Sequence, residues 1–172
     1  MVDILPPLLF WEILDELPAD KSAIQFPRNP VDYSKDYVVR VVLMNGNEWV
    51  GNFHGIDKQY FSGVFHWTKE NYLCVVSGGT AYVVQADDPE KYEELSVVPI
   101  VDSRSIVEVR MVIFVTFTDI YAYGENGIIW THELAIDGIE IKKIKNGIIY
   151  GISNNINKKV SFSIDIKTGE LS

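Results

Sequence analysis

The chain has 172 residues, of which 47% are hydrophobic and 23% are charged, as in an ordinary soluble globular protein. Its formal net charge of -9 argues against DNA binding and general nucleic-acid affinity, because phosphate binding needs a positive surface, and leaves room for a basic protein partner. A single cysteine, Cys74, excludes an internal disulfide framework and favours a reducing, cytoplasmic location.

The N-terminal segment, residues 1–36, is predicted to be a helix followed by a linker. Pro7 suits the first position of a helix, and the apolar side chains that follow recur at helical spacing over residues 7–17. The helix would either pack on a sheet or dock a partner. The segment has no positive n-region, so we do not expect it to be a secretion signal. Nowhere does the chain reach the roughly 18 apolar residues needed to cross a membrane.

After residue 36, turn signals alternate with short runs rich in Val, Ile, Tyr and Phe, a pattern typical of antiparallel hairpins. The turns are predicted at Asn45-Gly46, Gly78-Gly79, Asn126-Gly127, Asp137-Gly138, Asn146-Gly147 and Thr168-Gly169. We therefore expect a mainly β protein of roughly ten to twelve strands, in which antiparallel hairpins form a sandwich or two fused curved sheets beside one short N-terminal helix. Residues 37–172 would form one β region or two lobes, 37–101 and 102–172.

Two segments in the middle of the chain are predicted to be strands. Residues 95–101 are apolar, and residues 105–117 keep apolar side chains on one face without interruption, which predicts one long strand. The acidic segment 87–94 lies just before them. There, Asp88 before Pro89 predicts a one-turn helix with an N-cap.

The last third is predicted to be a meander with a bulge in its middle. In residues 139–145 the apolar parity shifts from Ile141 to Ile144, which predicts a β-bulge near Lys142-Lys143. Lysines are concentrated in this part of the chain. On exposed strands they are expected to protect the sheet edge from pairing with other chains.

Near the C-terminus, the sequence reads Gly-x-x-Tyr-Gly and then ends a strand with Asp-x-x-Thr-Gly. The matching residues are Gly147, Tyr150, Gly151, Asp165, Thr168 and Gly169. This stretch resembles half a blade of a quinoprotein-like β-propeller. A whole propeller needs about four blades or more, which 172 residues cannot supply. The resemblance therefore implies an antiparallel meander, without quinone binding, in which the Asp and Thr side chains hydrogen-bond the turn.

A second local pattern runs from Val39 to Phe65, with a strand, a turn glycine, an aromatic residue, a glycine and an Asp-containing loop. The matching residues are Gly46, Trp49, Gly51 and Asp57. The pattern resembles the first part of an Sm-like RNA-binding barrel. The RNA-contacting Asn of that family is absent after Asp57, and no Arg-Gly or Lys-Gly follows. The resemblance therefore implies a small, strongly bent β geometry, with RNA binding as an alternative function.

The main candidate binding surface is the aromatic face of a hairpin predicted from residues 48–54 and 60–67. With His54 opposite Tyr60, Gly51 faces Gly63 at the centre of this surface. Its aromatic residues are Trp49, Phe53, Phe61 and Phe65, followed by Trp67. Such a face is either core packing around a bend or a platform for a ligand.

Histidines supply the remaining candidate chemistry. The same hairpin register pairs His66 with Glu48 and separates it from His54 by about 20 Å, too far for both to bind one metal ion. His132 lies on the apolar side of its strand beside Trp130, as a hydrogen-bonded structural residue or a base. Cys74, between two apolar residues, is expected to be buried and inert.

The sequence limits the possible functions mainly through the catalytic and cofactor-binding motifs that it lacks. GxGxxG, P-loop, GxSxG and HExxH motifs and paired cysteines are absent, so we assign no catalytic residue and expect no metal or organic cofactor. The favoured hypothesis is a non-enzymatic, cytoplasmic protein-interaction module, immunity-like or chaperone-like, with a protein partner that is basic. The alternative is a small-molecule-binding or hydrolytic enzyme. Its pocket would combine His66 or His132 with aromatic residues such as Trp49, Phe53, Trp67 and Trp130.

Overall fold

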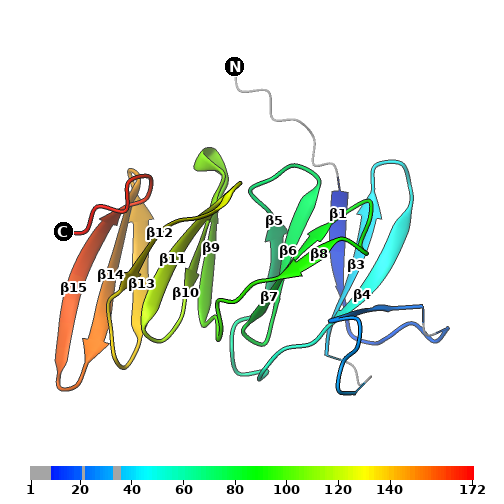
Figure 1. Ribbon diagram of the computed structural model, residues 1–172, viewed down its shortest axis with the longest axis horizontal. Helices are drawn as coiled ribbons and strands as arrows, with labels where there is room; N and C mark the ends of the chain where they lie inside the picture. The colour runs from blue at the N-terminus through cyan, green and yellow to red at the C-terminus, as the bar shows by residue number, and fades with distance from the viewer. Residues whose placement is uncertain (1–8, 21, 33–35) are drawn as a thin grey trace. The chain divides into compact units, whose positions relative to one another are not determined.

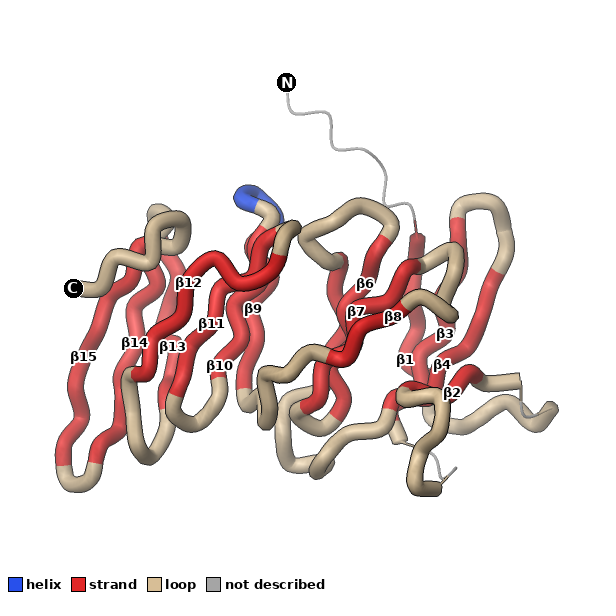
Figure 2. Tube along the Cα trace, viewed as in Figure 1, coloured by secondary structure: helices blue, strands red, loops and turns tan. Residues whose placement is uncertain are grey.

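A computed structural model describes residues 9–20, 22–32 and 36–172 of the chain. Within these residues there are 15 strands, one 3-10 helix and no α-helix (Figures 1 and 2). The strands form four sheets, and every pair is antiparallel except β2 with β4. The chain divides into two compact units, Met1–Ser96 (unit 1) and Val97–Ser172 (unit 2). The described residues include no helix long and apolar enough to cross a membrane.

Unit 1 contains two four-stranded sheets. The first sheet has the order β1-β3-β4-β2, and its strands in that order are Leu9–Leu14, Tyr37–Leu43, Glu48–Phe53 and Ile24–Phe26. The second sheet has the order β5-β6-β7-β8, and its strands are Gly63–His66, Tyr72–Ser77, Thr80–Gln85 and Tyr92–Glu94. β1 and β3 lie side by side in Figure 1, with β1 at the edge of its sheet.

The two sheets of unit 1 share one apolar core. It includes Leu9, Phe26, Val39, Val41 and Phe53 from the first sheet and Leu73, Val75, Tyr82 and Val84 from the second. At its centre the Phe26 and Phe53 rings stack with their centroids 4.3 Å apart. The Tyr82 hydroxyl donates a hydrogen bond of 2.6 Å to the carbonyl of His54, so a polar tie crosses between the sheets.

Unit 2 contains a four-stranded and a three-stranded sheet. The third sheet has the order β12-β11-β10-β9, with strands Gly127–Glu133, Asp119–Gly124, Met111–Val115 and Asp102–Ile106. The fourth sheet has the order β13-β14-β15, with strands Ile139–Lys145, Ile148–Asn155 and Lys158–Asp165. The 3-10 helix, Val107–Val109, joins β9 to β10.

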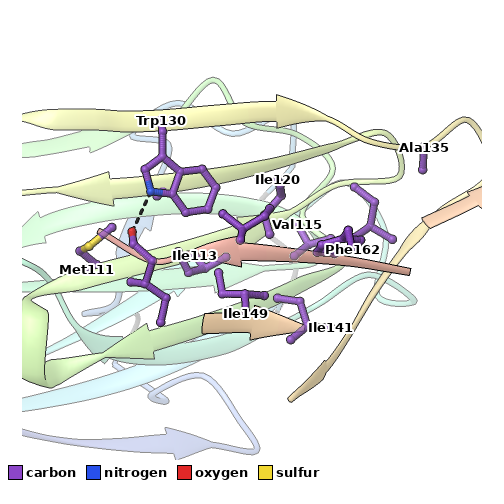
Figure 3. Close-up of a cluster of buried hydrophobic side chains, with 13 residues drawn as sticks. Met111, Ile113, Val115, Ile120, Trp130, Ala135, Ile141, Ile149 and Phe162 are labelled. Atoms are coloured by element: carbon purple, nitrogen blue, oxygen red, sulfur yellow. Dashed lines mark hydrogen bonds between the residues drawn. The ribbon is translucent and has the colours of Figure 1, made fainter. Parts of the chain in front are cut away.

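The core of unit 2 is also built from both of its sheets (Figure 3). Ile113 and Val115 of β10 and Ile120 of β11 meet Ile149 of β14 and residues of β15 there. Trp130 lies in the same cluster, and its Nε1 donates a hydrogen bond of 2.7 Å to the carbonyl of Ile166, drawn as the dashed line in Figure 3. The indole therefore buries its ring without leaving its one donor unsatisfied.

All six predicted turns are confirmed. Each contains a backbone conformation with positive φ, which glycine adopts at little cost and Asn tolerates. The residues concerned are Gly46, Gly78, Gly79, Gly127, Gly138, Asn146, Gly147 and Gly169. The C-terminal turn has the predicted side-chain chemistry: Asp165 Oδ1 accepts hydrogen bonds from the backbone and hydroxyl of Thr168.

The predicted bulge in the last third is also confirmed. Ile141 pairs with Gly151, whereas Lys143 pairs with Tyr150, so Lys142 is an extra residue on β13. The parity shift that predicted it follows from this insertion, because one additional residue exchanges the two faces of a strand.

The predicted N-terminal helix is wrong. Residues 9–14 are strand β1, which pairs with β3 along its whole length, while Pro7 and Leu8 lie outside the described residues. A short apolar run fits a helix and a strand equally well by periodicity. Here aromatic and β-branched side chains favour the strand, and tertiary pairing with β3 decides it.

The predicted hairpin between residues 48–54 and 60–67 is also wrong. β4 pairs with β3 and β2 in the first sheet, whereas β5 pairs with β6 in the second. Residues 54–62 therefore cross from one sheet to the other. Gly51 consequently does not face Gly63, and Glu48 pairs with Arg40 instead of His66.

Three predictions in the middle of the chain need correction. Residues 105–117 are not one strand, because the chain turns through the 3-10 helix and Arg110, whose φ of 51° is left-handed. No Gly or Asn marks that turn in the sequence. Residues 95–101 are not a strand, and residues 87–94 contain turns and β8 in place of a helix. The described residues also form 15 strands, more than predicted.

Candidate functional site

Two of the predicted binding residues, Trp49 and Phe53, lie on the inner face of the first sheet. Phe53 is fully buried, and Trp49 packs against the same apolar core. The Trp49 Nε1 donates a hydrogen bond of 2.8 Å to the carbonyl of Ala86, which satisfies its only donor. Both rings thus hold unit 1 together, which matches the core-packing alternative for the aromatic face.

The other three aromatic candidates lie in β5 or beside it. Phe61 and Trp67 flank the strand and are half-buried. Phe65 pairs with Cys74, while its neighbour Val64 packs toward the core, so Phe65 points to the opposite face of the second sheet. The structure therefore brings Trp49 and Phe53 together and directs Phe65 away from them.

His66 ends β5 and touches the first sheet. Its ring meets the Trp11 ring edge-on, with centroids 4.8 Å apart, so the edge strands β1 and β5 approach each other here. Partial burial lowers the pKa of His66 below its usual value of 6.5. His54, by contrast, hydrogen-bonds the side-chain oxygen of Gln25 through Nε2 at 2.9 Å.

His132, the candidate in unit 2, is held by the C-terminal turn. Its Nε2 lies 2.7 Å from the carbonyl oxygen of Gly169, and its ring lies 5.6 Å from that of Trp130. The arrangement fastens residues 166–169 to β12, which is the structural reading of this histidine.

Cys74 has the buried position that its neighbours predicted. It is fully inaccessible, and burial raises the pKa of its thiol well above the ordinary value. In residues 9–20, 22–32 and 36–172, no three His, Cys, Asp or Glu side chains gather in a way that would hold a metal ion.

Strand β1 is the feature that the sequence did not reveal. In an antiparallel sheet, successive residues direct their N–H and C=O groups to alternate sides of the strand. The N–H of Leu43 donates to Asn47 in the β3–β4 turn, so Val42 directs its backbone toward β1, where it pairs with Phe10. Leu9, Trp11 and Ile13 therefore direct their backbone groups away from β3, along the open edge.

This open edge is also apolar. β1 has the sequence LFWEIL, and among the described residues it pairs with β3 alone. Ile13, on the core side of the strand, is 54% exposed, and Phe10, on the solvent side, is 59% exposed. An edge strand with unpaired backbone and exposed apolar side chains is a ready template for another strand.

The edges of the second sheet and the far edge of the first are short. β2 and β8 have three residues each, and β5 has four. β8 also carries two exposed glutamates. Short and charged edge strands offer little to a pairing chain.

The edge strands of unit 2 have other features that hinder pairing with another chain. β13 has its bulge and exposed lysines, and β9 is mostly polar. β12 is irregular, because its pairing register with β11 shifts between Ala122 and Tyr123 of β11. One end of β15 is occupied, because Ser163 and Ser172 exchange backbone hydrogen bonds of 2.9 and 2.8 Å, and its other end begins with two exposed lysines. Among the described edge strands, β1 is thus the longest that has neither a bulge nor a lysine, and its one charged side chain is Glu12.

A sequence signal for this edge was available. Residues 9–14 contain no Lys, Gly or Pro, the residues that blunt exposed strands, whereas residues 139–145 contain three lysines. The signal becomes readable only once residues 9–14 are known to be a strand.

The fold and the edge define an all-β protein with two compact units and an open apolar strand on the first. Comparison with models of protein families, with curated proteins and with solved structures finds no match for the chain.

Proposed function

We propose that the protein is a non-catalytic β-sandwich module that binds a partner protein by taking up an extended segment of it as a strand beside β1. The observation that carries the proposal is the open backbone of Leu9, Trp11 and Ile13 at an apolar edge. Strand addition uses such an edge for affinity through main-chain hydrogen bonds, and uses alternate side chains for specificity.

The side chains around the edge support the same function. Trp11 is half-buried and backed by His66, while Ile13 leaves more than half of its surface open to solvent. An incoming strand would cover Ile13 and extend the first sheet by one strand. Removing apolar surface from water contributes about 25 cal/mol per Å², in addition to the hydrogen bonds.

The histidines and tryptophans considered for an enzyme pocket have structural roles in the fold, which favours a binding function over catalysis. Trp49, Trp130 and His132 each make a hydrogen bond to a backbone carbonyl that fastens one part of the fold to another. The only polar atom of each indole and the Nε2 atom of His132 are thereby committed to structure.

The test uses a proline in β1. Ile13→Pro deletes an N–H that points away from β3, and an edge strand tolerates proline at such a position. Ile13→Ala is the matched control, since it shortens the same side chain but keeps the N–H. The probes are three fluorescein-labelled eight-residue peptides that alternate valine with lysine, serine or glutamate.

Fluorescence anisotropy should detect binding of at least one peptide to the wild-type protein. Ile13→Pro should weaken that binding about tenfold or more, equivalent to about 1.4 kcal/mol, while Ile13→Ala stays within about threefold because the main-chain hydrogen bonds remain. Circular dichroism must show that both variants keep the β fold. If no peptide binds, or if the folded proline variant binds as well as wild type, strand addition at β1 is wrong.

A further inference from the structure

We infer that the segment taken up beside β1 is a basic strand, with apolar side chains alternating with Lys or Arg. The inference rests on the proposed function and adds the chemistry of the partner to it.

On the core side of the edge, the partner must supply apolar side chains. Leu9, Trp11 and Ile13 point to this side, Leu9 being part of the core of unit 1. Residues of an added strand that point the same way would lie beside Trp11 and Ile13. Because side chains alternate along a strand, these positions recur at every second residue of the partner.

On the solvent side, the central residue of β1 is acidic. Glu12 pairs with Arg40, and its side chain is 62% exposed. The same guanidinium lies 3.5 Å from Glu12 Oε2 and 2.5 Å from Glu48 Oε2. Two carboxylates thus share one cation, and a negative charge remains where the middle of an added strand would lie. A cation directly opposite it on the neighbouring strand is favourable.

The chain that leaves β1 extends this acidic character. Residues 9–20 include four acidic residues, Glu12, Asp15, Glu16 and Asp20, and no Lys or Arg. All four are exposed. A partner that runs past the end of β1 would therefore meet further carboxylates.

Charge is also unevenly divided between the two units. Residues 1–96 contain 7 Lys and Arg against 15 Asp and Glu, a formal net charge of -8, whereas residues 97–172 contain 8 against 9, a net charge of -1. The open edge thus belongs to the unit that carries nearly all of the excess negative charge. A basic segment is attracted to it, while a second copy of unit 1 at the same edge is repelled.

The experiment compares the valine–lysine peptide with the serine and glutamate peptides and with a block peptide of four valines followed by four lysines. The block peptide has the same composition and charge without the alternation. Two protein variants separate local from overall charge. Glu12→Gln removes a carboxylate at the edge, and Glu93→Gln removes an exposed carboxylate on β8 with the same change in net charge.

The alternating lysine peptide should bind at least tenfold more tightly than the glutamate or block peptide. Its affinity should fall with added salt, decrease three- to tenfold in Glu12→Gln, and stay within about twofold of wild type in Glu93→Gln. On binding, hydrogen exchange should slow at the Trp11 and Ile13 amides. The Phe10 and Glu12 amides, which face β3, should change less.

The outcomes separate the two proposals. If the serine or glutamate peptide binds as tightly as the lysine peptide and loses binding in Ile13→Pro, the basic partner is wrong and strand addition stands. If Glu12→Gln and Glu93→Gln weaken binding of the lysine peptide equally, the preference for that peptide depends on overall charge alone, and the inference is likewise overturned. A wild-type dimer that Ile13→Pro converts to a monomer would show that a second copy occupies the edge.

Discussion

A methyl group at Gly51 should disrupt the centre of unit 1. Gly51 lies on β4, between Ile24 of β2 and Val39 of β3, and faces the core. A Cβ at this position would lie 2.5 Å from Cε2 of Phe53 and 3.0 Å from Cε2 of Phe26. Both rings are fully buried and stack almost parallel, so Gly51→Ala pushes one ring of the stack into the other.

The size of the effect follows from the lack of room. Real Cβ atoms essentially never approach a heavy atom closer than 3.0 Å, so the Phe53 ring must move. On its other sides it meets Phe26 at 4.3 Å and Tyr82 at 5.6 Å between centroids. Overpacking of this kind costs about 1–3 kcal/mol of unfolding free energy. In a chain of this length each kcal/mol lowers the Tm by about 2–4 °C.

Urea unfolding followed by tryptophan fluorescence measures this loss, with Gly63→Ala as the control. A Cβ at Gly63 would lie 3.0 Å from Cζ at the far end of the half-buried Phe61 ring, and its three nearest atoms all belong to that ring. The control should therefore stay within about 0.5 kcal/mol of wild type. If Gly51→Ala unfolds at the wild-type urea concentration, the stack of Phe26 and Phe53 is not tightly packed around Gly51, and the reasoning is refuted.

Three further predictions follow from single side chains. Gly169→Ala should destabilise unit 2, seen as faster hydrogen exchange in β12 and β15, because Gly169 has a φ of 72° and a Cβ there would lie 2.6 Å from Trp130 Cγ. Burial lowers the pKa of His66 in the folded protein, so the unfolded chain binds a proton at a higher pH than the folded protein does. The free energy of unfolding should therefore fall as the pH drops below 6.5, and in urea titrations it should fall less steeply for His66→Gln. Cys74 should react with a thiol reagent only as the protein unfolds, so added urea should accelerate labelling.

Local chemistry explains which parts of the fold could be predicted. The six turns depend on residues that accept positive φ, and those residues are visible in the sequence. The bulge at Lys142 is equally local, because an extra residue shifts the apolar parity of its own strand. The Asp165 turn follows from one side chain that reaches backbone groups two and three residues away.

Long-range pairing explains the rest. Nothing in residues 48–67 says that β4 and β5 belong to different sheets, because consecutive strands usually pair and these do not. The turn at Arg110 lacks the Gly or Asn that would announce it. The candidate aromatic residues were identifiable as large and apolar. Which of them share a core depends on the sheet to which each belongs.

The N-terminal segment shows how such a correction alters the expected function. As a helix, residues 7–17 would have packed on a sheet or docked a partner through an apolar stripe of side chains. As an edge strand, residues 9–14 offer main-chain groups, and side chains such as Ile13 contribute only part of the contact. Substitution by alanine leaves those groups in place, whereas proline removes one of them. Comparing Ile13→Pro with Ile13→Ala therefore distinguishes recognition through the backbone from recognition through an apolar face.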